Sequence, residues 1–228
     1  MEENKRFAVA IDGPSGAGKS TLARSVAREL GAVYVDTGAI YRTVGYGAWR
    51  QGIDPGAEEE ICALLPQLEI SMAYDGDGLQ RMYLNGEDVT REIRLPPISL
   101  YASRVSAIPA VRSFLMDMQR DMARRCSVVM DGRDIGTVVL PQADVKIFLT
   151  AAPEARARRR LLELGQRGER ADYDTILRDI IQRDEQDRNR PVAPLRQAED
   201  AVLLDTTNLN LAESLQALLA IVKERIAL

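Results

Sequence analysis

The sequence predicts an α/β fold in which five buried parallel strands alternate with helices. Short apolar runs of five or six residues recur along the chain, and several of them end in an aspartate. The segments between these runs carry apolar residues at helical spacing. A glycine-rich turn joins the first run to the first helix. Alternation of this kind is typical of a doubly wound parallel sheet with right-handed crossovers and helices on both faces.

The individual elements follow from the same patterns. The predicted strands cover 7–12, 32–36, 127–131, 145–149 and 201–205. The predicted helices cover 21–30, 39–50, 58–65, 109–125, 153–165, 174–189 and 210 to the end of the chain. Pro109 is acceptable in the first turn of its helix, where the backbone N–H has no intrahelical partner. Asp36 or Thr37 is expected to cap the helix that follows the second strand.

A different pattern in the middle of the chain predicts a small antiparallel sheet. Apolar and polar residues alternate from Leu68 to Tyr74, and a second strand is expected over 81–84, followed by the hairpin signal Asn85-Gly86. Pro96-Pro97 predicts irregular backbone over 91–98, because proline disrupts a helix interior. We therefore expect an insert at 63–103 in a parallel core made of residues 1–62 and 104–228.

Composition excludes several classes of function. The chain is 46% apolar and 28% charged, which is typical of a globular protein with a buried core. It contains no histidine, which excludes Ser-His-Asp and Cys-His catalysis and histidine-based metal sites. The net charge of −4 disfavours general binding of nucleic acid. The 26 arginines against 4 lysines reflect either codon bias or bidentate phosphate recognition, and only their placement can separate the two.

The cysteines and the hydropathy pattern indicate a cytoplasmic protein. Cys62 and Cys126 form no C-x-x-C pair, so a disulfide framework or a zinc site is not expected. No apolar run is long enough to span a membrane, and the N-terminus lacks the apolar core of a signal peptide. We expect a reduced, soluble protein of the cytoplasm.

Residues 13–20 match the pattern G-x-x-x-x-G-K-[ST] of a phosphate-binding loop. Glycines let backbone N–H groups point at phosphates, the following helix N-terminus adds positive potential, and Lys19 reaches the outer phosphates. A chance glycine turn is disfavoured, because a strand precedes the loop and a helix follows it. The expected ATP-binding residues are Gly13, Pro14, Ser15, Gly16, Ala17, Gly18, Lys19, Ser20 and Thr21.

Two oxygen-bearing residues indicate a Mg²⁺ site. The hydroxyl of Ser20 in the loop can hold the ion. Asp131 ends an apolar strand, where the carboxylate of a Walker-B motif stands. We expect both residues to hold Mg²⁺ directly or through water.

Arginine-rich helices near the C-terminal third predict a closing lid over about 155–190. Arg156, Arg158, Arg159 and Arg160 occupy four of five consecutive positions with no paired acid among them, which is costly without an anion. The turn 165–168 is a plausible hinge to the next helix, which carries Arg183, Arg188 and, just beyond it, Arg190. A solvated helix face is the alternative interpretation.

These features favour phosphoryl transfer to a second, anionic substrate. The chain has no N-K-x-D segment of the kind that reads guanine in nucleotide switches. Phosphoryl transfer needs positioning and charge stabilisation, which converging arginines supply. A closing lid keeps water from competing for the phosphoryl group.

Four segments resemble the bacterial cytidylate kinases, a family of nucleoside monophosphate kinases, and the resemblance extends along essentially the whole chain. The segments are 11–21, Asp36-Thr37-Gly38-Ala39-Ile40-Tyr41-Arg42, Asp131-Gly132-Arg133-Asp134-Ile135-Gly136-Thr137-Val138-Val139, and 183–190. The second and third are specific to this family, whereas the phosphate-binding loop is not. The insert at 63–103 is similar to the extended monophosphate-binding domain of the bacterial enzymes.

The resemblance implies roles for the matching residues. The implied catalytic residues are Lys19, Arg133, Arg159, Arg183 and Arg190. The implied CMP-binding residues are Thr37, Arg42, Ser103, Arg112, Arg133, Asp134, Arg183, Asp187 and Arg190. Thr37 stands where the family often has serine, and it keeps the hydroxyl. Arg156, Arg159 and Arg160 are the implied lid arginines, and Asp187 is the residue expected to contact the acceptor sugar.

The implied reaction is ATP + (d)CMP ⇌ ADP + (d)CDP, by direct in-line transfer with Mg²⁺, in pyrimidine nucleotide metabolism. A monomer without nucleic-acid or membrane partners is expected. Three alternatives stay open at this point: a kinase for UMP or a non-nucleotide acceptor, a regulatory module that binds ATP without turnover, and a nucleic-acid-binding protein. The last is disfavoured by the acidity and the few aromatic residues.

Overall fold

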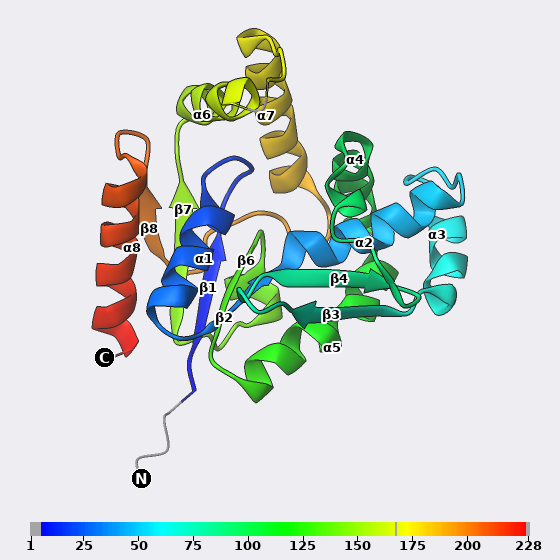
Figure 1. The fold of residues 1–228 in the computed structure, drawn as a ribbon, viewed down its shortest axis with the longest axis horizontal. Coiled ribbons are helices and arrows are strands. Elements are labelled where there is room, and N and C mark those ends of the chain that lie inside the picture. The colour runs from blue at the N-terminus through cyan, green and yellow to red at the C-terminus, as the bar shows by residue number, and fades with distance from the viewer. Residues whose placement is uncertain (1–5, 167, 227–228) are drawn as a thin grey trace. The chain divides into compact units, whose positions relative to one another are not determined.

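The computed structural model describes residues 6–166 and 168–226, which fall into two compact units (Figure 1). The first unit comprises Met1–Ala32 and Ser127–Leu228, and the second comprises Val33–Cys126. Each unit contains buried apolar residues that form its core.

A five-stranded sheet has the order β2-β6-β1-β7-β8. Its strands are β1 (Ala8–Asp12), β2 (Val33–Asp36), β6 (Val128–Gly132), β7 (Val145–Thr150) and β8 (Val202–Asp205). In the first unit, β1 pairs in parallel with β6 and with β7, and β7 pairs in parallel with β8. Three successive apolar residues in each of β1 and β6 are fully buried, as expected for strands covered on both faces: Val9, Ala10 and Ile11, and Val128, Val129 and Met130. The predicted α/β class with a parallel sheet is confirmed.

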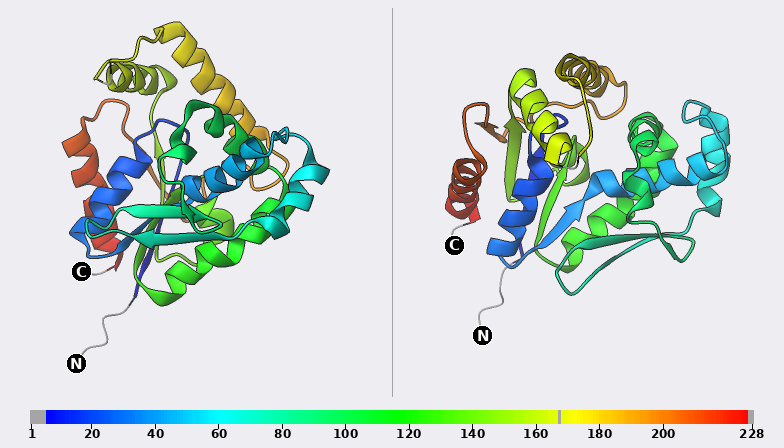
Figure 2. Two further views of the ribbon diagram at one scale, coloured as in Figure 1. Left: turned by 45° about the vertical axis from the view of Figure 1, so that its right-hand side comes forward. Right: turned by 45° about the horizontal axis from the view of Figure 1, so that its top comes forward.

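Besides a short π-helix, the described residues of the first unit form four α-helices. They are α1 (Lys19–Glu29), α6 (Pro153–Gln166), α7 (Tyr173–Asn189) and α8 (Leu211–Ile226). α1 contacts β6 and α8, and Figures 1 and 2 show α1 and α8 side by side. α6 and α7 pack on each other through a small apolar cluster that includes Ala157, Ile176 and Ile180. Within the expected hinge, Arg167 lies outside the described residues, as do residues 227–228 of the last predicted helix.

The second unit combines helices with an antiparallel sheet. The helices are α2 (Thr37–Arg50), α3 (Glu58–Leu64), α4 (Pro96–Val105) and α5 (Pro109–Arg125), with 3₁₀ turns at Leu65–Gln67 and Glu92–Arg94. The sheet has the order β3-β4-β5, with β3 at Ile70–Tyr74, β4 at Gln80–Leu84 and β5 at Glu87–Asp88. Both pairings are antiparallel, which confirms the predicted small sheet. The boundaries of the insert at 63–103 stay a prediction.

The irregular backbone predicted around Pro96-Pro97 is wrong. A 3₁₀ turn covers Glu92–Arg94, and α4 begins at Pro96 with the two prolines in its first turn. First-turn residues need no intrahelical N–H donor, so proline costs nothing there and its fixed φ suits the helix. Leu95 has the extended backbone (ψ 144°) that a following proline favours. Position relative to the helix start therefore decides the effect of these prolines.

Candidate active site

The phosphate-binding loop connects β1 to α1 and requires glycine at its first position. Gly13 has φ +152°, and a Cβ added there would lie 1.9 Å from the carbonyl oxygen of Leu149 in β7. Gly18 precedes α1 in a left-handed conformation, and no side chain caps the helix. The first N–H groups of a helix lack intrahelical acceptors, so the N-terminus of α1 can bind an anion.

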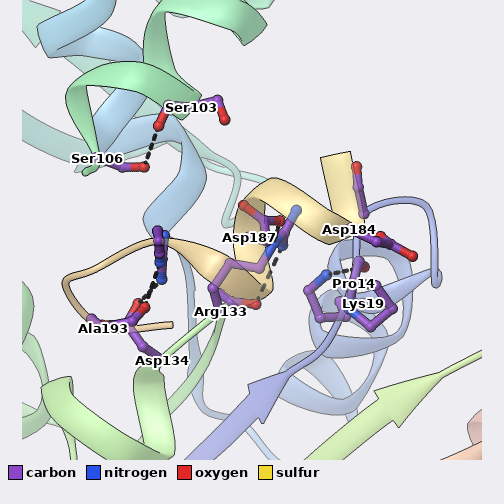
Figure 3. A network of polar contacts seen from close by, with 12 residues as sticks. Pro14, Lys19, Ser103, Ser106, Arg133, Asp134, Asp184, Asp187 and Ala193 are labelled. Atoms are coloured by element: carbon purple, nitrogen blue, oxygen red, sulfur yellow. Dashed lines mark hydrogen bonds and ion pairs between the residues drawn. The ribbon is translucent and has the colours of Figure 1, made fainter. Parts of the chain in front are cut away.

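Lys19 is buried inside this loop, with 5% of its surface exposed. Its Nζ donates a hydrogen bond to the Pro14 carbonyl oxygen at 2.7 Å (Figure 3). Burial, together with the charge of Arg133, lowers the pKa of Lys19 to about 7, although Asp131, Asp187 and Asp12 act in the opposite direction. A buried ammonium is costly unless it is paired. The negative charge of a phosphate bound in the loop would supply that pairing.

Ser20 and Asp131 bring two oxygen ligands together beside Lys19. The Ser20 hydroxyl donates to Oδ2 of Asp131 at 2.9 Å, and Asp131 lies buried near the end of β6. Among the described residues no cluster of three or more acids, cysteines or histidines could hold a metal by itself. Mg²⁺ is commonly bound by one or two protein oxygens together with substrate phosphates and water. The Ser20–Asp131 pair fits that pattern.

Two ion pairs join the segment after β6 to the end of α7. Arg133 donates from Nε to Oδ2 of Asp187 at 2.6 Å (Figure 3). Arg190 donates from Nη2 to Oδ1 of Asp134 at 3.2 Å, and both side chains are buried. Burial would raise the pKa of Asp187, but the charges of Arg133, Arg183 and Arg190 hold it below its usual value. The five acceptor-side residues predicted from the first unit therefore gather in one charged group.

Arg156, Arg159 and Arg160 of α6 have protein partners. Arg156 pairs with Asp184 and Arg160 pairs with Glu163 at 2.8 Å, so the expectation that the cluster lacks paired acids is wrong for these two. Arg159 donates to the carbonyl oxygens of Thr206 and Leu209. Its catalytic role stays a prediction.

The other four predicted acceptor residues belong to the second unit. Thr37 is the buried first residue of α2, and Arg42 lies one turn further on, half-buried. Arg112 is 4% exposed, stands 5.7 Å from the centre of the Tyr41 ring, and donates to the Ser106 carbonyl oxygen at 3.3 Å. The Ser103 carbonyl accepts from the Ser106 hydroxyl at 2.8 Å (Figure 3).

Asp36 holds the start of α2 in place through several hydrogen bonds. Its contacts with Gln80 were not predicted from the sequence. Oδ1 of Asp36 accepts from the Ala39 N–H at 2.9 Å, so Asp36 is the cap. The Gln80 side chain accepts from the Asp36 N–H at 2.8 Å and donates to its carbonyl at 3.3 Å. Arg94 pairs with Oδ2 of Asp36 at 3.2 Å. These contacts fix the backbone that leads into Thr37.

The model of one protein family, described as cytidylate kinase, matches residues 9–224. The chain belongs to the cytidylate kinase family. It is 49% identical to a cytidylate kinase of Caldicellulosiruptor bescii over 94% of this chain and 95% of that one. It is also 49% identical to a cytidylate kinase of Geobacter sp. (strain M21), over 96% and 94% of the two chains. A solved shikimate kinase from Bacteroides thetaiotaomicron aligns with 97% of this chain and 99% of its own, at 17% identity and a TM-score of 0.49.

As a member of the cytidylate kinase family the chain is a phosphotransferase.

Asp12 is a buried acid of the site to which the sequence analysis gave no role. Asp12 ends β1 and is 5% exposed. Its two oxygens accept the backbone N–H groups of Ile135 and Gly136, both at 2.8 Å, at the start of a π-helix over Ile135–Val139. Asp12 therefore fixes the backbone just after Arg133 and Asp134. An acid closing a buried strand directly before the phosphate-binding loop was the available signal.

Asp12 should make stability depend on pH. Burial raises the pKa of this carboxyl from 3.8 to about 6, against the lowering effect of the two backbone hydrogen bonds, and Asp134 adds to the rise. Between these values the folded state binds more protons than the unfolded state, so the contribution of Asp12 to stability falls as the pH rises. Relative to Asp12→Asn, the wild-type free energy of unfolding should decrease by about 2 kcal/mol from pH 4 to pH 7.

Urea unfolding of the wild type and of Asp12→Asn between pH 4 and pH 7 measures the difference between their free energies of unfolding. Lost hydrogen bonds in the variant shift its stability by an amount that does not depend on pH. Asp179→Asn makes the same substitution at an exposed position of α7 and is the matched control. A difference between wild type and Asp12→Asn that does not change with pH would contradict the raised pKa of Asp12.

Proposed function

We propose that this protein transfers the γ-phosphoryl group of ATP to CMP and dCMP, forming ADP with CDP or dCDP, in pyrimidine nucleotide metabolism. The observation that carries the proposal is the buried Lys19 in the phosphate-binding loop, in the same unit as the charged group of Arg133, Asp134, Asp187 and Arg190. Membership of the cytidylate kinase family supports the same reaction.

On the donor side, the loop would bind the ATP phosphates through its backbone N–H groups and the N-terminus of α1. Lys19 would exchange the Pro14 carbonyl for a phosphate oxygen, which pairs its buried charge. Ser20 and Asp131 would hold Mg²⁺, directly or through water. When bound, the ion neutralises charge on the phosphate oxygens.

On the acceptor side, Thr37, Arg42 and Arg112 would bind the monophosphate nucleotide, and Ser103 would read the base. The cytosine edge offers an amino donor and a carbonyl acceptor, so hydroxyl, guanidinium and carboxylate groups are suitable readers. Uracil would leave a buried donor or acceptor without a partner, which costs about 1–3 kcal/mol. The proposed site therefore favours cytosine.

The transfer itself would be direct. The acceptor phosphate is an oxyanion near neutral pH and needs no strong base. Arg133, Arg159, Arg183 and Arg190 would stabilise the charge that spreads over the transferring group, and positioning supplies most of the remaining effect. A helical lid over about 155–190 would exclude water. A covalent intermediate is not expected.

An acceptor panel tests the proposal. ADP release from ATP is measured in a coupled assay with CMP, dCMP, UMP, AMP and GMP as separate acceptors. CMP and dCMP should give kcat/KM values at least tenfold above the other three, since one unpaired buried group corresponds to about tenfold. Equal values across the panel would contradict the cytidylate specificity and favour a kinase for another acceptor.

Arg112→Met should weaken acceptor binding selectively. The guanidinium is buried beside Tyr41, and the variant removes one charge-assisted contact to the nucleotide. We expect KM for CMP to rise about tenfold or more, with KM for ATP unchanged within twofold. Initial rates over a grid of both substrates separate the two constants. Arg124→Met, an exposed change on the same helix, is the control; a rise in KM for ATP instead would contradict the assignment.

The remaining expectations are also proposals. We propose a cytoplasmic monomer that binds nucleotides and no nucleic acid. Within the described residues, no helix is both long and apolar enough to cross a membrane.

A further inference from the structure

Arg156 is an almost fully buried cation that joins three parts of the first unit. With 1% of its surface exposed, it donates from Nε to the Ala151 carbonyl oxygen at 2.8 Å. Its Nη1 donates to the Ser15 carbonyl oxygen at 2.8 Å. Its two terminal nitrogens also bind both oxygens of Asp184, at 3.0 and 2.5 Å. The contacts link the end of β7, the phosphate-binding loop and α7.

The contact with Ser15 determines the orientation of one peptide of the phosphate-binding loop. The C=O and the following N–H of a trans peptide point in opposite directions. A donor that holds the Ser15 carbonyl on one side therefore turns the Gly16 N–H to the other side. Lys19 holds the neighbouring Pro14 carbonyl in the same way, but it would leave that carbonyl when it binds a phosphate. Arg156 is bound to Asp184 and can stay on the loop when nucleotide is present.

The contact with Asp184 fixes the rotation of α7 about its own axis. Asp184 is 2% exposed and stands one turn beyond Ile180, on the face of α7 that packs against α6. Asp187, nearly one turn further, binds Arg133, and Arg183 is adjacent in sequence (Figure 3). A bidentate pair between a rigid fork and a carboxylate allows little rotation of the helix.

We propose that Arg156 and Asp184 form a positioning pair, which holds the Ser15–Gly16 peptide in its phosphate-binding orientation and couples the loop to the helix that carries Arg183 and Asp187. Arg156 thereby acts through its neighbours and does not contact the transferred phosphoryl group. The link to turnover rests on the proposed phosphorylation of CMP, whereas the effect on binding rests only on ATP as the ligand of the phosphate-binding loop.

The first test is Arg156→Lys, which keeps the charge beside Asp184. A single ammonium cannot serve two carbonyls and both carboxylate oxygens in the fork geometry of arginine. We expect Tm within a few degrees of wild type, Kd and KM for ATP raised about tenfold, and a lower kcat with CMP. Wild-type Kd and KM in a folded variant would overturn the proposal. Arg124→Lys, at an exposed position of α5 outside the proposed lid, is the control and should leave all three constants unchanged.

The second test removes both charges in Arg156→Met/Asp184→Leu. Breaking a buried pair on one side leaves an uncompensated charge, whereas replacing both partners with apolar residues of similar size is often neutral for stability. The double variant should recover the Tm lost in Asp184→Leu alone, but its Kd for ATP should stay about tenfold above wild type. Recovery of both quantities would mean that the pair stabilises the fold only.

Calorimetric binding of ATP separates this inference from the proposed function. Wild type should bind ATP whether or not CMP is its acceptor. If wild type binds ATP but does not phosphorylate CMP, the proposed acceptor is wrong and the pair is judged on ATP binding alone. If wild type phosphorylates CMP and both variants bind ATP normally, the positioning role is wrong.

Discussion

Lys19→Met is expected to lower kcat about a thousandfold while the protein stays folded. The ammonium is the charge that the loop would place against the transferring phosphoryl group, and loss of one preorganised donor of this kind costs about 10²–10³ in kcat. Burial and Arg133 lower the pKa of Lys19, so the charge is held at a cost to the fold. Its removal should therefore leave Tm within a few degrees of wild type.

Steady-state rates with ATP and CMP measure this effect, and a thermal unfolding curve confirms that the variant is folded. Lys223→Met on α8 is the matched control, because it removes the same charge from an exposed position. A folded Lys19→Met protein with more than a third of wild-type kcat would contradict the donor assignment. It would favour a nucleotide-binding protein in which turnover has no role.

Arg133→Met is expected to lower kcat at least a hundredfold, with a much smaller change in KM for ATP. Arg133 donates to Asp187 at 2.6 Å and its charge also lowers the pKa of Lys19, so it acts on both the phosphate-binding lysine and the charged group. Its guanidinium would stabilise charge that develops only in the transition state, and such an interaction acts on kcat. Asp187 keeps favourable charges from Arg183 and Arg190, so the variant should fold.

Substrate grids with Arg133→Met and Arg133→Lys measure this prediction. The lysine variant keeps the charge without the planar fork and should retain more kcat than the methionine variant. A raised KM for CMP with unchanged kcat in both variants would make Arg133 a binding residue and exclude it from catalysis.

Local signals were sufficient for most of the fold. The strands of the parallel sheet are apolar runs and most helices have regular apolar spacing, so these elements can be identified from short windows of sequence. Neither α4 nor the short exposed strand β5 was predicted. The phosphate-binding loop combines a motif with its required neighbours, β1 and α1, and both are present. The prediction of irregular backbone over 91–98 was wrong because proline, which disrupts a helix interior, is also favoured in the first turn of a helix, where Pro96 and Pro97 lie.

Ion pairs between residues far apart in the sequence could not be predicted from such local signals. The acid that pairs with Arg156 is Asp184, 28 positions away, so the arginines of α6 looked unpaired. The buried face of α7 runs through Ile176 and Ile180 to Asp184 and Asp187. Acids at apolar positions of a helix require buried partners, and this was the signal that could have revealed the pair. The π-helix after Asp134 has no comparable signal.

Direct phosphoryl transfer to CMP is tested most directly by following the γ-phosphoryl group itself. The protein is incubated with γ-labelled ATP, Mg²⁺ and CMP, and the label is traced by chromatography and on the protein. We predict that the label appears only in the β-phosphate of CDP, with one ADP formed for each CDP. Label in inorganic phosphate with CMP unchanged, or label bound covalently to the protein, would contradict direct transfer.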